Sequence, residues 1–199
     1  MSPAHVLEPT YRRLKRSLTT GLWPPGTRLE AARLADEFGV SMTPVRDCLN
    51  RLVGERLVDF RPGEGYRVAW LSEGLLRDLI AFNAALLELA LRDRAAGSPP
   101  GKLRLGKSDH ADGLATLFET IAQCSGSPAL VESVRALNDR LHAARSLEPK
   151  LLGDAPATLR CLVRQLNLND PALHDGLAAY HQECRSRAEA FVRLLEQGH

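Results

Sequence analysis

The chain has 199 residues, of which 44% are hydrophobic and 25% are charged; this composition is typical of folded domains and excludes a wholly disordered protein. Its formal net charge of +2 is too small to indicate a nucleic-acid ligand by itself. The longest apolar stretch, residues 75–91, contains Arg77, Asp78 and Glu88, so we expect no membrane span. No secretory signal is recognisable at the N-terminus, which predicts a cytoplasmic protein.

Cysteine spacing and the distribution of charge add two constraints. The cysteines form neither a Cys-x-x-Cys pair nor a zinc-finger spacing, and we expect reduced thiols at Cys48, Cys124, Cys161 and Cys184. Up to residue 70 the basic residues outnumber the acidic ones, so the positive end of the chain is the N-terminal one.

Three short helices are predicted in the N-terminal third. Apolar residues recur at helical spacing over residues 7–18 and again over residues 30–38, where Gly39 ends the second helix. Thr43 then offers an N-cap, and Pro44 fits the first helical position because its missing N–H is harmless there. A helix, a tight glycine turn and a second helix have the spacing of a helix-turn-helix.

A β-hairpin is predicted directly after the third helix. Residues 57–60 and 66–70 are two short runs rich in β-branched and aromatic residues, separated by a Pro/Gly loop at residues 61–65. A hairpin at this place is the wing of a winged helix-turn-helix. The first turn of the third helix is then expected to enter the major groove of duplex DNA, with the wing along a groove edge. The candidate DNA contacts are Arg33, Ser41, Met42, Thr43, Pro44, Arg46, Arg51, Gly63 and Gly65.

The same segment carries a family resemblance. The run from Leu18 to Ala69, with its Pro-Pro-Gly linker, Gly-Val-Ser turn and Thr-Pro-Val-Arg helix start, resembles the DNA-binding domain of GntR regulators. The resemblance implies a dimer that binds a near-palindromic operator. Relatives usually have arginine where this sequence has Met42, so one common base or phosphate contact is missing.

From Ser72 onward the pattern is helical throughout. The segments with helical spacing of Leu, Ala and Val are residues 73–95, 113–124, 128–144, 155–166 and 171–197. The sequence therefore predicts a mainly α protein: a winged helix-turn-helix DNA-binding domain over residues 1–71, and an all-helical bundle for effector binding and dimerisation over residues 72–199.

The helical part is similar to the FCD effector domain found in the FadR branch of GntR regulators. Many FCD domains hold a divalent metal with one aspartate and three histidines, and these positions fall on Ala115, Glu119, Leu159 and His181. Only His181 is retained, so most of the coordination sphere is lost and no metal or other cofactor is expected. Glu119 and His181 remain as candidate residues of an effector pocket, and the resemblance implies a small organic acid as effector.

Two functions remain open at this point. The first is a ligand-responsive regulator, most simply a repressor, that binds double-stranded DNA as a homodimer. The second is a protein that binds DNA constitutively, whose helical domain serves only for oligomerisation or protein interaction. An enzyme using Glu119, His142 and His181 is a third reading, but none of the usual catalytic motifs occurs and no organised site supports it.

Overall fold

The computed structural model describes residues 3–93, 102–106 and 109–198. Contacts divide the chain into two compact units: residues 1–71 together with 194–199, and residues 72–193. Within the described residues, no helix is both long enough and apolar enough to span a membrane.

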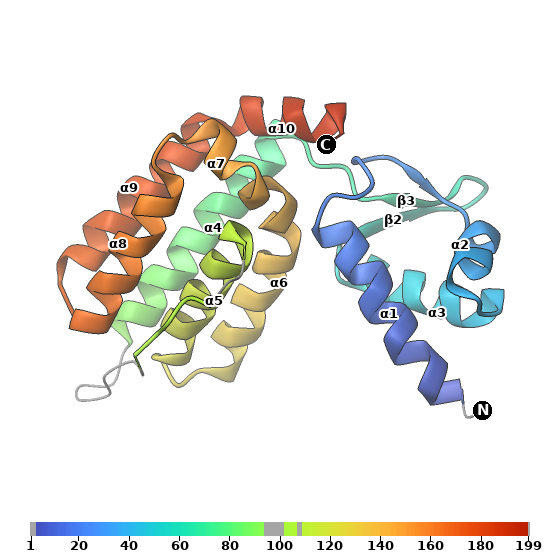
Figure 1. Ribbon diagram of the computed structural model, residues 1–199, viewed down its shortest axis with the longest axis horizontal. Coiled ribbons are helices and arrows are strands. Elements are labelled where there is room, and N and C mark those ends of the chain that lie inside the picture. Colours follow the sequence, from blue (N-terminus) through green and yellow to red (C-terminus); the bar gives the residue numbers. More distant parts are fainter. Residues whose placement is uncertain (1–2, 94–101, 107–108, 199) are drawn as a thin grey trace. The chain divides into compact units, whose positions relative to one another are not determined.

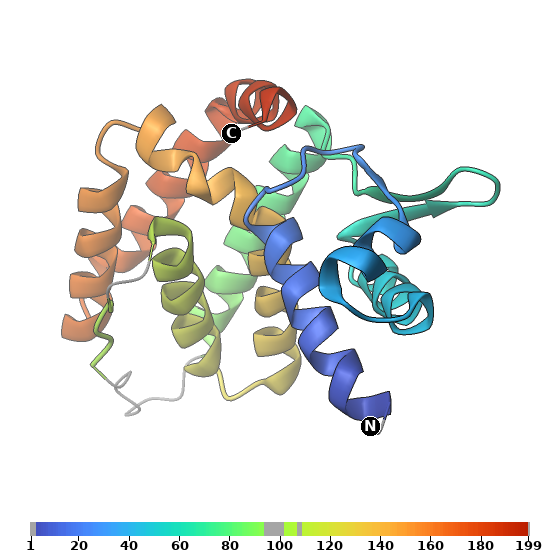
Figure 2. The ribbon, with the colours of Figure 1, turned by 45° about the vertical axis from the view of Figure 1, so that its right-hand side comes forward.

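The first unit is a winged helix-turn-helix (Figures 1 and 2). Its elements are α1 (Pro3–Thr19), β1 (Arg28–Leu29), α2 (Ala31–Phe38), α3 (Met42–Gly54), β2 (Val58–Arg61) and β3 (Gly65–Val68). The strands form an antiparallel sheet in the order β1-β3-β2, with Phe60 opposite Tyr66 in the β2–β3 hairpin. The hairpin projects beyond the helices of its unit in Figure 2. The predicted N-terminal fold is confirmed.

One core holds these elements together. Three helices contribute apolar residues at intervals of three or four, so each helix buries one stripe against the others. The core is closed on the sheet side by Leu29, Leu57, Val58 and Val68. The helical members are Tyr11, Leu14, Leu18, Leu34, Ala35, Val45, Cys48, Leu49 and Leu52.

The start of α3 differs from the sequence expectation. The helix begins at Met42, after Ser41 in an extended conformation, so Thr43 lies inside the helix and is not its cap. Pro44 still falls in the first turn, where backbone N–H groups lack intrahelical partners and proline costs no hydrogen bond. The second strand of the hairpin also ends earlier than expected, at Val68.

The second unit is an all-α bundle, as predicted (Figure 1). Side chains of Ser72, Asp109 and Ser127 cap three of its helices by accepting hydrogen bonds from backbone N–H groups in the first turn. The helices are α4 (Glu73–Arg92), α5 (His110–Gln123), α6 (Pro128–Ser146), α7 (Glu148–Leu151), α8 (Ala155–Leu168), α9 (Ala172–Ser186) and α10 (Ala188–Gln197), of which α10 belongs to this unit up to Arg193.

Three boundaries in this unit differ from the sequence expectation. The helical segment predicted at 171–197 is two helices, α9 and α10, separated at Arg187. The short helix α7 was not predicted, because four residues are too few for a periodic pattern. Helix α4 ends at Arg92, and residues 94–95 of its predicted span lie outside the described residues.

Replacing Leu49 by alanine tests the packing of α3. Leu49 is fully buried, so Leu49→Ala should lower the free energy of unfolding of the first unit by about 2–5 kcal/mol through lost burial and the cavity left behind. Met42→Ala on the same helix is the matched control: Met42 is 45% exposed, and its truncation should change stability by less than about 0.5 kcal/mol. Urea unfolding followed by fluorescence reports this unit, because Trp23 and Trp70 are the chain's two tryptophans. Equal midpoints for the two variants would contradict the assigned core.

Candidate nucleic-acid interface and buried polar core

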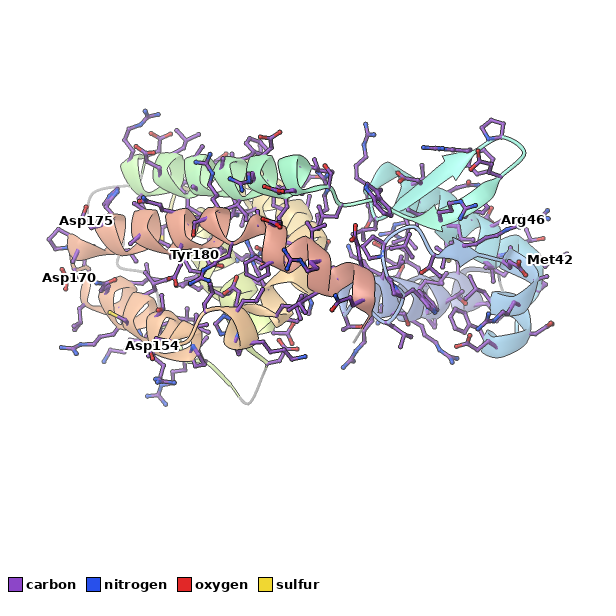
Figure 3. All side chains as sticks on the ribbon, turned by 90° about the horizontal axis from the view of Figure 1, so that it is seen from above. Met42, Arg46, Asp154, Asp170, Asp175 and Tyr180 are labelled. Atoms are coloured by element: carbon purple, nitrogen blue, oxygen red, sulfur yellow. The ribbon has the colours of Figure 1, made fainter. Side chains whose placement is uncertain are left out.

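Helix α3 presents a polar face to the surface of its unit. Val45, Leu49 and Leu52 turn inward and are fully buried. The side chains on the opposite face of the helix are exposed, and Met42 and Arg46 both point outward in Figure 3. The exposed residues at the start of this helix are Ser41, Met42, Thr43 and Arg46, with Pro44 half-buried among them.

The turn before α3 fixes its direction. Gly39 adopts the left-handed conformation at φ 65°, which favours glycine, and its N–H closes the end of α2. Val40 donates a second backbone hydrogen bond to the carbonyl of Ala35. Only two residues, Val40 and Ser41, then separate this turn from the first residue of α3. The start of α3 is therefore held by backbone geometry.

Two of the arginines predicted to contact DNA form no ion pair with the residues that the structure describes. Arg46 and Arg33 are both exposed, and neither forms an ion pair with another of the described residues. Arg46 lies on the second turn of α3, whereas Arg33 lies on α2 beside a surface hollow that Arg28 also lines. An exposed guanidinium without an internal partner is free to bind phosphate or a guanine edge.

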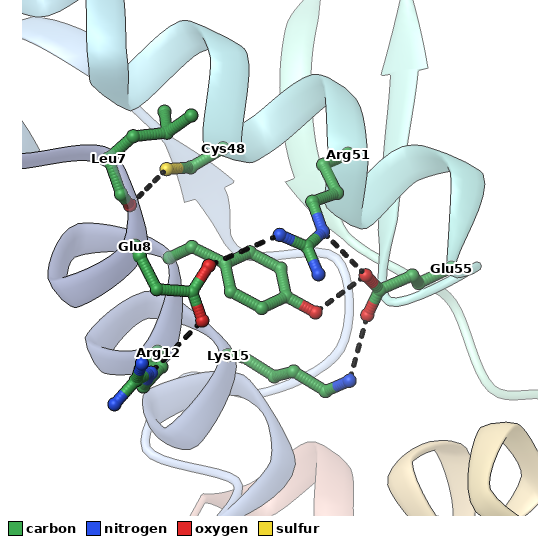
Figure 4. Close-up of polar contacts among 8 residues, drawn as sticks. Leu7, Glu8, Arg12, Lys15, Cys48, Arg51 and Glu55 are labelled. Carbon is green, nitrogen blue, oxygen red and sulfur yellow. Dashed lines mark hydrogen bonds and ion pairs between the residues drawn. The ribbon is translucent and has the colours of Figure 1, made fainter. Parts of the chain in front are cut away.

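Arg51, also predicted as a DNA contact, makes several contacts within the protein (Figure 4). Its guanidinium lies 3.6 Å from the ring centroid of Tyr11, 3.5 Å from a carboxylate oxygen of Glu8 and 3.3 Å from one of Glu55. The contacts with Glu8 and Tyr11 join α3 to α1, whereas Glu55 is the C-cap of α3 itself. The helical pattern predicted an exposed arginine here, but it did not predict that α1 packs beside it.

Glu55 is the centre of this cluster. Its carboxylate accepts hydrogen bonds from the Tyr11 hydroxyl at 2.6 Å and from the Lys15 ammonium at 2.9 Å. Partial burial raises the pKa of Glu55, but the hydrogen bonds from Tyr11 and Lys15 outweigh burial and hold it below its ordinary value. The carboxylate is therefore ionised at neutral pH and pairs with Arg51 as well.

The β2–β3 turn is open to an approaching surface. Gly63 and Gly65 have φ values of 83° and 81°, which only glycine adopts without strain. A Cβ atom added at either position would meet no described atom within 4 Å. Beside this turn, the hydroxyl of Tyr66 on β3 donates a hydrogen bond of 2.7 Å to Oδ1 of Asn50 on α3. The wing and α3 are thus joined by a side-chain contact.

The second unit contains a buried polar core. Arg145 is 4% exposed, and its guanidinium donates to Oδ1 of Asn138 at 2.7 Å and to Oδ1 of Asn83 at 3.2 Å. Glu148 is 2% exposed and accepts a hydrogen bond from Tyr180 at 2.7 Å, while His110 lies 2.7 Å from its other oxygen. Burying charged groups is costly unless they are paired in this way.

His181 lies beside this core, and its neutral imidazole has too few N–H donors for the two acceptors that it faces. Its Nδ1 lies 2.7 Å from the carbonyl oxygen of Leu177, and its Nε2 lies 3.1 Å from Oδ1 of Asn83, so both ring nitrogens face acceptors. Burial lowers the pKa of His181 to about 4, although the Leu177 carbonyl opposes the shift. A neutral imidazole donates from only one nitrogen. In addition, Nδ2 of Asn83 has no hydrogen-bond partner among the described residues.

The structure does not bring Glu119 and His181 into one pocket. Glu119 is bound to Arg135 of α6 and Gln123, and it lines neither of the hollows that contain His181. Phe118, the preceding residue, stacks on the His181 ring with centroids 5.7 Å apart. Because successive residues of a helix are rotated by about 100°, the two neighbours face different directions. Of the two predicted pocket residues, His181 lines both of these hollows and Glu119 lines neither.

The family's metal positions do not fit a metal ion here. His181 meets Phe118, and Leu159 is a buried hydrocarbon side chain packed against Gly113. Ala115 contributes only its carbonyl oxygen, which accepts a hydrogen bond from Asn138. The fourth position, Glu119, carries a carboxylate, but this is bound to Arg135 and Gln123. One imidazole nitrogen and one engaged carboxylate are too few ligands for a stable site.

A second group of metal-type ligands lies at the start of α5. Ligand atoms of Asp109, Asp112 and His142 lie within 4.8 Å of one another. Asp109 caps α5 by accepting a hydrogen bond from the N–H of Asp112, and Nε2 of His142 lies 3.1 Å from the Asp112 carboxylate. A helix cap and a surface pair account for this group without an ion.

His181 lines two hollows of the second unit. A cavity of about 20 Å³, enough for one water molecule, adjoins Asn83, Arg145 and Glu148. A hollow of about 260 Å³ lies between α4 and α9 and is bordered by Glu88 and Asp175.

The polar residues of this buried core were not identified from the sequence. Asn83 and Arg145 interrupt otherwise apolar helix faces, and this interruption is the signal in the sequence that could have found them.

Comparisons with known proteins agree with this geometry. Residues 8–68 match the model of the family described as bacterial regulatory proteins, gntR family. The chain is 29% identical over 140 residues to the HTH-type transcriptional repressor GlaR of Escherichia coli, covering 67% of this chain and 59% of that protein. It is 34% identical over 80 residues to the E. coli HTH-type transcriptional regulator McbR, covering 39% and 36%. The alignments thus span less than two thirds of these relatives' lengths.

Solved structures share the fold of the whole chain. E. coli McbR/YncC superposes with a TM-score of 0.63 at 20% identity, covering 94% of this chain and 97% of that one. A putative transcriptional regulator GntR from Rhodococcus sp. RHA1 has a TM-score of 0.73 at 14% identity, covering 92% and 97%. The first unit therefore has the fold of the winged helix-turn-helix class. Within it, residues 8–68 are similar to the gntR family of bacterial regulatory proteins.

The buried histidine predicts a specific dependence of stability on pH. The unfolded chain binds a proton at His181 below its ordinary pKa of 6.5, whereas the folded chain does so only near pH 4. Acidification from pH 7 to pH 4 should therefore cost the second unit up to about 3 kcal/mol through this residue. In His181→Gln this part of the pH dependence should disappear. His174→Gln, an exposed histidine on the same helix, is the control. Urea unfolding followed by circular dichroism measures both; parallel pH profiles for wild type and His181→Gln would contradict the assignment.

Proposed function

We propose that this chain is a transcription regulator that binds double-stranded DNA as a homodimer. The observation that carries the proposal is the polar, unobstructed first turn of α3 beside the β2–β3 hairpin, within a GntR-type domain. In helix-turn-helix proteins the N-terminal turn of the second helix enters the major groove. The domain assignment that goes with this function is DNA binding by residues 1–71 and dimerisation with effector binding by residues 72–199.

Arg46 is the residue we assign to base recognition. Its guanidinium is exposed and has five N–H donors in a fork that matches O6 and N7 of guanine. We assign phosphate binding to the exposed hydroxyl groups of Ser41 and Thr43, assisted by the backbone N–H groups at the start of α3. Met42 offers no charge at the place where relatives usually carry arginine, which reduces the number of phosphate or base contacts.

The proposed operator follows from symmetry. A homodimer with a two-fold axis presents two identical α3 helices, so the DNA sequence that fits both is near-palindromic. Gly63 and Gly65 leave the wing backbone free to approach the sugar-phosphate chain. Such a regulator acts in the cytoplasm, and the site geometry gives no reason to assign it an enzymatic activity.

For the second unit we propose an effector-binding role and a degenerate relationship to the FCD domains of the FadR branch. Two features support an acid as ligand: the buried Arg145 guanidinium and the unpaired Nδ2 donor of Asn83, both at the cavity beside His181. Constitutive DNA binding is the second candidate. It is favoured by Phe118 and Leu159, which fill the neighbourhood of His181 and Gly113 with hydrocarbon.

Arg46→Ala tests the recognition helix. The operator is first selected by the wild-type protein from a library of randomised DNA duplexes. Loss of a base-reading arginine should weaken binding to that duplex by about 1–3 kcal/mol while the fold is retained. Arg160→Ala, an exposed arginine on α8, is the matched control and should bind as the wild type does. Affinities measured by fluorescence anisotropy that are equal for wild type and Arg46→Ala would refute the assigned contact.

A thermal-shift screen separates the two roles of the helical unit. Small mono-, di- and tricarboxylates are added to the wild-type protein, and a binding acid at 100 times its Kd should stabilise it by about 2.7 kcal/mol. Arg145→Met should abolish the shift, whereas Arg135→Met at the surface should retain it. If no acid raises the melting temperature of a protein that still binds its operator, the constitutive alternative is correct.

A further inference from the structure

Asn50 is exposed on the side of α3 that carries Met42 and Arg46. The three residues are spaced at four-residue intervals, so they follow one another along the helix surface. Tyr66 reaches Asn50 from the wing and donates its hydroxyl proton to Oδ1 at 2.7 Å. The Tyr66 ring is itself held by Phe60, with centroids 4.9 Å apart.

This hydrogen bond determines what Asn50 offers to a ligand. Tyr66 occupies one of the two lone pairs of Oδ1, whereas none of the described residues accepts a hydrogen bond from Nδ2 of Asn50. Asparagine recognises adenine by donating to N7 and accepting from N6 at the same time, which requires both groups. With Oδ1 partly engaged and Nδ2 wholly available, Asn50 is better matched to a ligand that accepts a hydrogen bond than to adenine.

We propose that Asn50 donates a hydrogen bond to a DNA phosphate and that Tyr66 is the residue that positions it. The proposal rests on the DNA-binding function proposed above. A phosphate oxygen only accepts hydrogen bonds, so it matches the available Nδ2 donor of Asn50. Asn50 also lies eight residues beyond Met42, which is about 12 Å along the helix axis. Base edges are contacted by the N-terminal residues of such helices, whereas this position lies beside the wing.

Two substitutions of Asn50 test the contact on DNA. Affinities are measured for the wild-type-selected operator and for a scrambled duplex of the same length. Asn50→Ala should weaken binding to both duplexes by the same factor, about twofold to tenfold, which is the range for one neutral hydrogen bond. Asn50→Asp keeps an acceptor for Tyr66 but directs negative charge at the phosphate, and should weaken binding by more than about tenfold.

A double-mutant cycle tests the role of Tyr66. If Tyr66 acts through Asn50, Tyr66→Phe should weaken DNA binding of the wild type by about twofold or more but leave the affinity of Asn50→Ala unchanged. A structural role would instead lower the affinity of both backgrounds equally. Urea midpoints of all four proteins, read by tryptophan fluorescence, establish whether the fold of the first unit is retained.

The outcomes are distinguishable. Equal losses on both duplexes together with coupling between Tyr66 and Asn50 support the proposal. A loss confined to the operator would mean that Asn50 reads a base, and unchanged affinity of Asn50→Ala would mean that it contacts nothing; either result overturns the proposal. A wild-type protein that selects no duplex would instead contradict the proposed function, before any variant is compared.

Discussion

The burial of one face of α3 is the constraint on which the DNA-binding unit depends. Val45, Leu49 and Leu52 are fully buried. Burial of these three residues on one face fixes the orientation of α3 about its own axis. That orientation places Arg46 and Met42 outside. The polar face is therefore a consequence of packing, because the same periodicity that fills the core determines which side chains remain exposed.

Two polar contacts restrain α3 from opposite sides of this buried face. Arg51 joins it to α1 through Glu8, Glu55 and the Tyr11 ring, and Asn50 joins it to the wing through Tyr66. The Asn50–Tyr66 hydrogen bond is exposed and the Arg51 guanidinium is half exposed, so the hydrogen bond and the ion pairs contribute little to stability. Their effect on geometry is larger: a helix that inserts into a groove must keep its angle to the wing when both bind the same duplex.

The sequence was sufficient for the architecture but not for the direction of individual side chains. Gly39, Pro44 and the Pro/Gly loop of the hairpin have strong local preferences. Together with the helical spacing of apolar residues and the two runs rich in β-branched and aromatic residues, they predicted the helix-turn-helix and the wing. The contacts of Arg51 with α1 could not be predicted, because periodicity shows that a residue is off the core face without showing which neighbouring element it meets. The surroundings of Glu119 could not be predicted for a related reason: a shift of one residue along α5 leads to Phe118, which is the residue that contacts His181.

The size of the cavity and the charge beside it constrain how an effector would act. Arg145 carries five N–H donors, and its two hydrogen bonds to Asn138 and Asn83 leave others for a carboxylate. The adjoining cavity of about 20 Å³ is large enough for one water molecule but too small for an organic acid. An acid that binds Arg145 must therefore displace surrounding side chains. Its affinity then differs between the helical bundle of this structure and a bundle whose side chains have moved to admit the acid. Such a difference in affinity is the requirement for a ligand to shift a conformational equilibrium.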